Sequence, residues 1–108
     1  MGTFEVFRSE ANREFYFRFK SGNQLLNSEG YGTKSNCQNG VESVKKNAPL
    51  DGRYDRKNGD GRYSFNLKAA NGEIIARGTK VYDTAKERDE VIEIIKKEVP
   101  GASIVDLT

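Results

Sequence analysis

Two closely similar helix ends, about fifty residues apart, constrain this chain more than any other feature. The stretch "VESVKKNAP" occupies residues 41–49, and "IEIIKKEVP" occupies residues 92–100. In each, apolar residues three apart precede two lysines and a proline, which is how an amphipathic helix ends. These are the only two prolines of the chain. The sequence therefore predicts an internal duplication, with one helix in each copy.

Strand patterns precede each helix end and are repeated with it. "FYFRFK" and "YSFNLK" both alternate apolar with polar residues, which is typical of a strand that buries one face. The expected strands are 4–8, 15–20 and 24–29 in the first copy, and 53–57, 63–68 and 73–78 in the second. Allowing one inserted residue after "YSFNLK" aligns Leu25 and Leu26 with Ile74 and Ile75.

The start of each helix is also marked. Thr84 with Glu87 three residues on is a capping box, which predicts a helix over about 85–98. Thr33 is the matching cap in the first copy. The helix after it should bury a stripe formed by Cys37, Val41, Val44 and Ala48.

Together these elements predict an α+β fold built from two tandem β3-α-β units. We place unit one at residues 1–50 and unit two at 51–108, within a single domain. One unit alone is marginal in size, because short chains bury too little surface to be stable. We therefore expect one continuous antiparallel sheet shared by both units, with both helices on one face and a pseudo-twofold axis between the halves.

Three segments carry a resemblance to a known family. "LKAANGEII" at 67–75, taken with the two helix ends, resembles the YegP-like family of small, mostly bacterial proteins over nearly the whole chain. The resemblance implies β3-α-β units that exchange their last strands. Single-unit members form homodimers, so a two-unit chain is expected to be a monomer that imitates that dimer. The family has no known function, and the resemblance implies no catalytic residues.

Composition excludes several functions. The net charge of +2 predicts no strong attraction to nucleic acid or anionic membrane surfaces. No apolar run approaches the roughly 20 residues that a membrane helix needs, and the N-terminus does not resemble a signal peptide. A single cysteine allows no internal disulfide, so we expect a cytoplasmic protein.

Sites of chemistry are scarce. The chain has no histidine, which removes the commonest general base and metal ligand. Cys37 lies on the apolar helix stripe, so a buried structural cysteine is favoured over a redox thiol. The acidic "NGDG" at 58–61 is interpreted as a hairpin turn, because the spaced acids of a calcium loop do not follow it. We expect no catalytic residues, no metal and no cofactor.

One surface is a candidate binding site. The polar residues that alternate with the apolar ones in strands 15–20 and 63–68 should share the face of the sheet that points away from the helices. Aromatic and cationic sheet faces can hold single-stranded nucleic acid, whereas a solvated polar face is the ordinary alternative. The candidate residues are Tyr16, Arg18, Lys20, Ser64, Asn66 and Lys68. If both strands lay near the pseudo-axis, their polar patches would join.

These observations favour a non-enzymatic binding or structural module with an unidentified partner. A protein or peptide partner ranks first, and exposed strand edges are one way to bind it. Weak, salt-sensitive binding of single-stranded nucleic acid is the alternative. An enzyme that uses carboxylates and lysines is a second alternative, although no pair of acidic residues recurs at strand ends in both copies.

Overall fold

The computed structural model describes residues 2–108, which contain seven strands and two α-helices. The second helix runs from Ala85 to Glu98, as predicted. Both threonine caps are confirmed: the hydroxyl oxygens of Thr33 and Thr84 each accept a hydrogen bond of 3.1 Å from a backbone N–H group. The strands are β1 (Thr3–Arg8), β2 (Phe15–Ser21), β3 (Asn23–Asn27), β4 (Tyr54–Gly59), β5 (Arg62–Lys68), β6 (Ile74–Gly78) and β7 (Ser103–Asp106). The helices are α1 (Lys34–Asn47) and α2 (Ala85–Glu98), with short 3₁₀ turns η1 (Asp51–Arg53) and η2 (Val99–Gly101).

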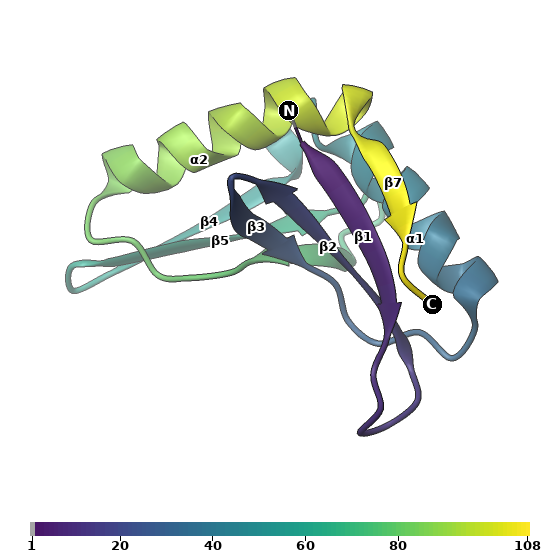
Figure 1. The fold of residues 1–108 in the computed structure, drawn as a ribbon. Coiled ribbons are helices and arrows are strands. Elements are labelled where there is room, and N and C mark those ends of the chain that lie inside the picture. The colour runs from purple at the N-terminus through teal and green to yellow at the C-terminus, as the bar shows by residue number, and fades with distance from the viewer. Residues whose placement is uncertain (1) are drawn as a thin grey trace.

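All seven strands join one sheet, in the order β4-β5-β6-β3-β2-β1-β7. Both α-helices cover the same face of it (Figure 1). The two units meet at β3 and β6, where Asn27 lies opposite Arg77 and Leu26 lies opposite Gly78. The predicted α+β fold, with one continuous sheet and two helices on one face, is confirmed. None of the helices among residues 2–108 is long and apolar enough to span a membrane.

The last strand departs from the expected antiparallel sheet. β7 belongs to the second unit, yet it pairs with β1 of the first, and it runs parallel to β1 from Thr3↔Ser103 to Val6↔Asp106. Its direction is set by the crossover through α2 and not by a hairpin turn. The first unit has no such strand, because the chain leaves α1 through η1 and enters β4 directly. Strand exchange therefore occurs once.

The register of the repeat differs from the expected alignment by one residue. Leu26 lies opposite Phe19 in the first unit, and Ala76 lies opposite Leu67 in the second. Leu26 therefore corresponds to Ala76 and not to Ile75. The hairpin loop of the second unit is longer by two residues, since five residues (69–73) take the place of three (21–23).

The core lies between the sheet and the helices. Phe4, Phe17 and Phe19 contribute aromatic rings from β1 and β2, and the predicted α1 stripe is fully buried against them. Gly40 lets α1 approach closely, because a Cβ there would lie 2.4 Å from the Tyr31 hydroxyl oxygen. The fully buried residues of the two helices and their ends are Cys37, Val41, Val44, Ala48, Ile92, Ile95 and Val99.

Candidate functional site

The six candidate residues lie on the face of the sheet opposite the helices, which we call the outer face. They alternate with the buried phenylalanines and leucine of β2 and β5, and all six are half-buried. β2 and β5 are separated by β3 and β6, so the two patches do not touch. Asn27 and Arg77 lie between Arg18 and Asn66 in the sheet register. The condition under which the two patches would join, with both strands near the junction of the two units, is not met, because β3 and β6 lie there.

Carboxylates neutralise the cations of the outer face. Glu5 accepts a hydrogen bond of 2.6 Å from Arg18 and lies 3.9 Å from the Lys20 ammonium group. Asp55, at the corresponding position of the second unit, lies 3.6 Å from Lys68. A hydrogen bond from the neighbouring Lys57 lowers the pKa of Asp55. This pairing leaves the outer face with few cations that are free to hold phosphate groups.

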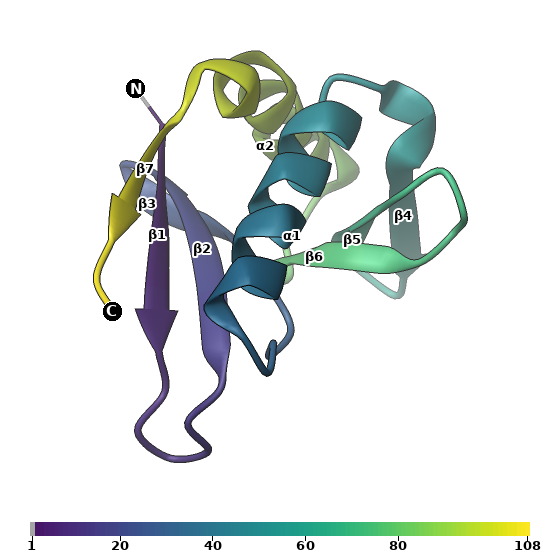
Figure 2. The ribbon, with the colours of Figure 1, turned by 90° about the vertical axis from the view of Figure 1, so that its right-hand side faces the viewer.

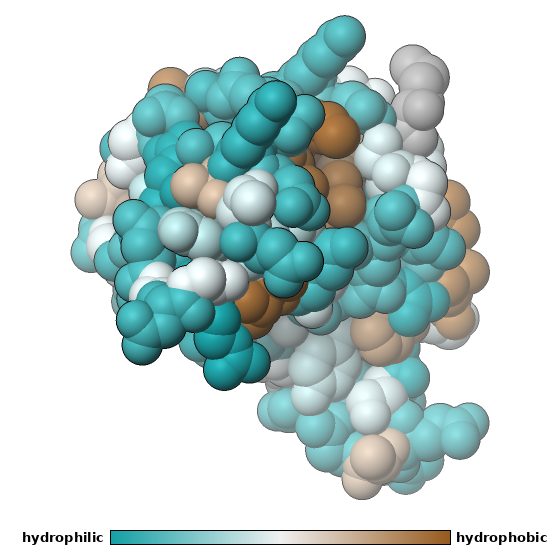
Figure 3. Space-filling view, turned by 90° about the vertical axis from the view of Figure 1, so that its left-hand side faces the viewer, coloured by the Kyte–Doolittle hydropathy of each residue, from teal (hydrophilic) through white to brown (hydrophobic). Residues whose placement is uncertain are grey.

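The one aromatic side chain of the candidate patch is already engaged. Tyr16 stacks on Phe7 with ring centroids 5.8 Å apart, and its hydroxyl oxygen accepts a hydrogen bond of 2.8 Å from Asn12. The guanidinium group of Arg18 lies 4.4 Å from the centre of the Phe7 ring. The side of the molecule opposite α1 is mostly hydrophilic, with apolar areas in separate places only (Figure 3).

The edge formed by β7 is a second candidate, which sequence reasoning did not single out. One side of β7 pairs with β1, and no strand among residues 2–108 pairs with its other side (Figure 2). All four of its residues are exposed, including Ile104 at 43% and Val105 at 40%, and Leu107 follows at 51%. This edge therefore combines free backbone groups with exposed apolar side chains, which is the combination that invites strand pairing.

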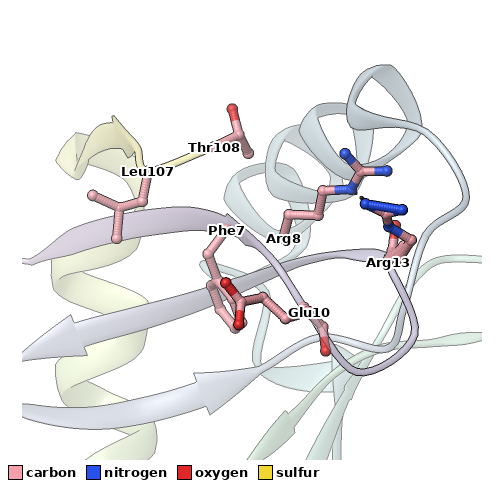
Figure 4. A pocket seen from close by; sticks show the side chains of 7 residues that line it. Phe7, Arg8, Glu10, Arg13, Leu107 and Thr108 are labelled. Atoms are coloured by element: carbon pink, nitrogen blue, oxygen red, sulfur yellow. Dashed lines mark hydrogen bonds between the residues drawn. The ribbon is translucent and has the colours of Figure 1, made fainter.

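A hollow of about 470 Å³ lies beside the end of β7, between the β1–β2 loop and the residues after the strand. We call it the corner hollow. Figure 4 shows Leu107 and Thr108 on one side of it, Arg8 and Arg13 on the other, and Phe7 with Glu10 below β1. The residues that line it are Phe7, Arg8, Ser9, Glu10, Arg13, Leu107 and Thr108.

The loop that holds the two arginines is ordered by its own hydrogen bonds. Arg8 donates from Nε to the carbonyl oxygen of Arg13 at 3.2 Å, and its guanidinium group lies 5.3 Å from the centre of the Phe15 ring. Arg13 has a φ of 63°, in the left-handed region that costs a non-glycine residue free energy. Neither guanidinium group forms an ion pair within residues 2–108.

The β1–β2 loop and β7, which meet at the corner hollow, both break the symmetry of the repeat. The loop from Ser9 to Glu14 has six residues, whereas the matching loop of the second unit has four (59–62). β7 has no counterpart beside β4. The sequence did indicate that the two hairpins differ, since the first hairpin lacks the short "NGDG" turn of the second. No local pattern indicated that residues 107–108 lie beside the loop of the first hairpin.

Other sites of chemistry have little support from the geometry. Cys37 is fully buried, and burial raises the pKa of its thiol to about 11, so that the unreactive thiol form prevails at neutral pH. Within residues 2–108, no group of three histidine, cysteine or acidic side chains is placed to hold a metal ion.

Comparison with known proteins places this architecture in a family. The sequence profile of the family described as "Domain of unknown function (DUF1508)" matches residues 10–55 and again residues 58–106. The chain is 47% identical over 109 residues to the "UPF0339 protein in ptx operon 5'region" of Stutzerimonas stutzeri, covering 98% of this chain and 96% of that protein. It is 37% identical to the UPF0339 protein YegP of Escherichia coli K12, covering 99% and 98%.

Solved structures agree with the sequence matches. The solution NMR structure of the UPF0339 protein SO3888 from Shewanella oneidensis superposes with a TM-score of 0.88 at 36% identity, covering 99% of this chain and 92% of that chain. The solution NMR structure of yegP from E. coli, described as a protein of unknown function, gives 0.88 at 35% identity, covering 99% and 93%. The two separate profile matches fit the tandem repeat.

Proposed function

This chain belongs to the DUF1508 family, also named UPF0339, and we propose that it is a non-enzymatic module that binds a segment of another protein. The proposed segment adds as a further strand to the free edge of β7. The module is proposed to act as a monomer in the bacterial cytoplasm. One observation carries the proposal: β7 is an edge strand on which both Ile104 and Val105 are exposed.

Strand addition suits this edge for a physical reason. Backbone hydrogen bonds give such complexes their affinity, and side chains that alternate between the two faces give them specificity. Ile104 lies opposite Phe4 in the register and so points to the helix face, whereas Val105 lies opposite Glu5 on the outer face. A partner strand with apolar residues on both faces would bury Ile104 and Val105 together.

A neutral probe tests the proposal: a short blocked peptide in which pairs of valines alternate with pairs of threonines, so that both faces of the strand carry valine, with a glutamine at each end. Added to the ¹⁵N-labelled chain, the neutral probe should shift the amide resonances of residues 103–107 and leave those of β4 in place. Val105→Lys should weaken binding, because a lysine on an edge strand opposes pairing. Val81→Lys is the matched control, since Val81 is 50% exposed and lies outside the strands.

Two results would refute strand addition at β7. One is a set of resonance shifts centred on the outer face or on β4. The other is equal binding of the neutral probe by the Val105→Lys and Val81→Lys variants.

Single-stranded nucleic acid remains the second candidate ligand, at the six residues of the outer face. Because Glu5 and Asp55 already pair with the lysines and arginine there, we expect weak binding that disappears with added salt. Fluorescence anisotropy of a labelled oligonucleotide at two salt concentrations tests this alternative, and an unchanged signal at micromolar protein removes it.

A further inference from the structure

The corner hollow places two arginines without a counter-ion at the end of the proposed binding edge. Most other cations near the sheet lie within 4 Å of a carboxylate; examples are Arg18 with Glu5 and Arg77 with Glu29. Arg8 and Arg13 are exposed, form no ion pair within residues 2–108, and are held together by the hydrogen bond from Arg8 to the Arg13 carbonyl oxygen.

The hollow lies where a strand added to β7 would continue. Pairing between β1 and β7 ends at Val6↔Asp106, and the Leu107 N–H donates to the Val6 carbonyl oxygen at 2.8 Å. Arg8 is two residues beyond Val6, so its side chain leaves β1 past the end of β7. A segment paired with β7 and extended past Leu107 would therefore reach the hollow.

We propose that the corner hollow binds a carboxylate of the partner, supplied by an acidic residue immediately before the segment that pairs with β7. This inference rests on the proposed function. Antiparallel pairs outnumber parallel ones by roughly two to three to one, so the partner is expected to run antiparallel to β7. The hollow lies at the C-terminal end of β7, which is the N-terminal end of an antiparallel partner.

The charges around the hollow suit a carboxylate. Among the side chains that line the hollow, Arg8 and Arg13 contribute two positive charges and Glu10 contributes one negative charge, so these side chains carry a net charge of +1. A singly charged carboxylate balances this charge, whereas a phosphate group would exceed it. Guanidinium groups also match the two oxygens of a carboxylate through paired hydrogen bonds.

The second unit has no equivalent of this site. Arg8 lies opposite Phe15, and the corresponding pair in the second unit is Asn58 with Tyr63. Asn58 accepts a hydrogen bond of 2.6 Å from the buried Arg88, so its side chain joins β4 to α2. The position of Arg8 is thus held by an uncharged side chain in the second unit.

Three probes test the inference: the neutral probe, the same peptide with glutamate in place of its first glutamine, and the same peptide with glutamate in place of its last. The first acidic probe should bind about fivefold more tightly than the neutral probe at low salt, as expected for an exposed ion pair. This preference should disappear at high salt. It should also disappear in the double variant Arg8→Gln/Arg13→Gln and persist in the control Arg62→Gln, which alters an exposed arginine of the other hairpin.

The outcomes separate this inference from the proposed function. Equal binding of all three probes, unaffected by the double variant, overturns the carboxylate site and leaves strand addition standing. A preference for glutamate at the last position instead overturns the antiparallel orientation. Absence of binding by every probe, with unchanged resonances at residues 103–107, overturns both. Concentration-dependent dimerisation of the chain that excludes the probes overturns the choice of partner in favour of a second copy.

Discussion

The sheet has two edge strands, β4 and β7, and they expose side chains of opposite kinds. β4 carries charged side chains beyond its buried Tyr54, and Arg56 is held by Asp51 at 2.9 Å and by Asp89 at 3.1 Å. β7 has no buried residue, and Ile104 and Val105 stand exposed on its two faces. Charges on an edge oppose pairing with other chains, whereas exposed apolar residues invite it.

This difference arises from how the two units end. The two units share their strands, caps and core positions, but only the second ends in a strand that crosses to the other unit. In the first unit, the corresponding segment became η1 and led into β4. The edge at β4 is therefore an ordinary hairpin strand tied to α2, whereas the strand at the β7 edge pairs with β1 alone among the described strands.

The largest expected effect on stability comes from removing the hydrogen bonds that join α2 to β4. Arg88 of α2 is 3% exposed and donates to Asn58 at 2.6 Å and to the Lys57 carbonyl oxygen at 3.2 Å. Arg88→Met keeps much of the volume but leaves these acceptors without a donor. We expect the free energy of unfolding in urea to fall by about 2–3 kcal/mol. The control Arg62→Met, at an exposed site, should change it by no more than about 0.5 kcal/mol. Equal losses in both variants would contradict this account of the β4 edge.

Local features of the sequence predicted much of this fold. Alternation predicted β2 and β5, and the two threonine caps predicted the helix starts, because each depends on neighbouring residues only. The direction of β7 and its single exchange depend on how α2 lies over the sheet, which no local pattern encodes. The division between residues 50 and 51 stays a prediction.

The candidate site was harder to predict, for the same reason. The outer-face residues were placed on the correct face, but their separation depends on the strand order. The corner hollow joins residues 7–13 to residues 107–108, which are nearly the whole chain apart. Spacing along the sequence gives no access to such a contact, although the longer loop of the first hairpin hinted that the two units differ there.

The second largest effect should come from acid, and three of the four carboxyl groups within residues 2–108 with a lowered pKa lie on β4 or pair with its Arg56. Hydrogen bonds from Arg56 lower the pKa of Asp51, and those from Lys57 lower the pKa of Asp55. Burial opposes the shift at Asp89, but its paired arginines still lower the pKa of that carboxyl group. Carboxylates with a lowered pKa stabilise the fold above the unfolded value of about 3.9, and this contribution is lost as the pH falls through the folded value.

The midpoint of thermal unfolding should therefore fall as the pH drops from about 4 towards 2. The triple variant Asp51→Asn/Asp55→Asn/Asp89→Asn should start lower at pH 7 and show a shallower fall. Asp106→Asn, at the β7 edge, removes one such group, whose pKa is lowered chiefly by a hydrogen bond from Lys34. It should keep most of the wild-type pH dependence. A triple variant that is as acid-sensitive as the wild type would show that the titrating groups lie elsewhere.

A smaller effect is expected from making the β4 edge resemble β7. Asp55→Val/Lys57→Val puts two apolar side chains on the outer face of β4, where Asp55 and Lys57 now pair at 3.2 Å. The variant should self-associate more strongly than the wild type in sedimentation velocity at about 100 μM, since weak edge pairing falls in that range. Asp55→Asn/Lys57→Gln removes the same charges without adding apolar surface and should sediment as the wild type does. Association of both variants would assign the protection of β4 to charge alone.

The smallest effect concerns the contact between Lys34 of α1 and Asp106, which ties β7 to a helix. Both side chains are more than one-third exposed, so the contact should contribute little to global stability. Lys34→Met is expected to leave the midpoint of unfolding unchanged. Amide exchange reports on local opening instead, and the Leu107 N–H, bonded to the Val6 carbonyl oxygen at 2.8 Å, should exchange faster in the variant. Arg56→Met at the other edge should lower the midpoint, because Asp51 and Asp89 each lose one of their two cationic partners. A result in which Lys34→Met lowers the midpoint of unfolding as much as Arg56→Met does would show that β7 is fixed as firmly as β4. It would contradict the view that the β7 edge accepts a partner strand more readily than the β4 edge.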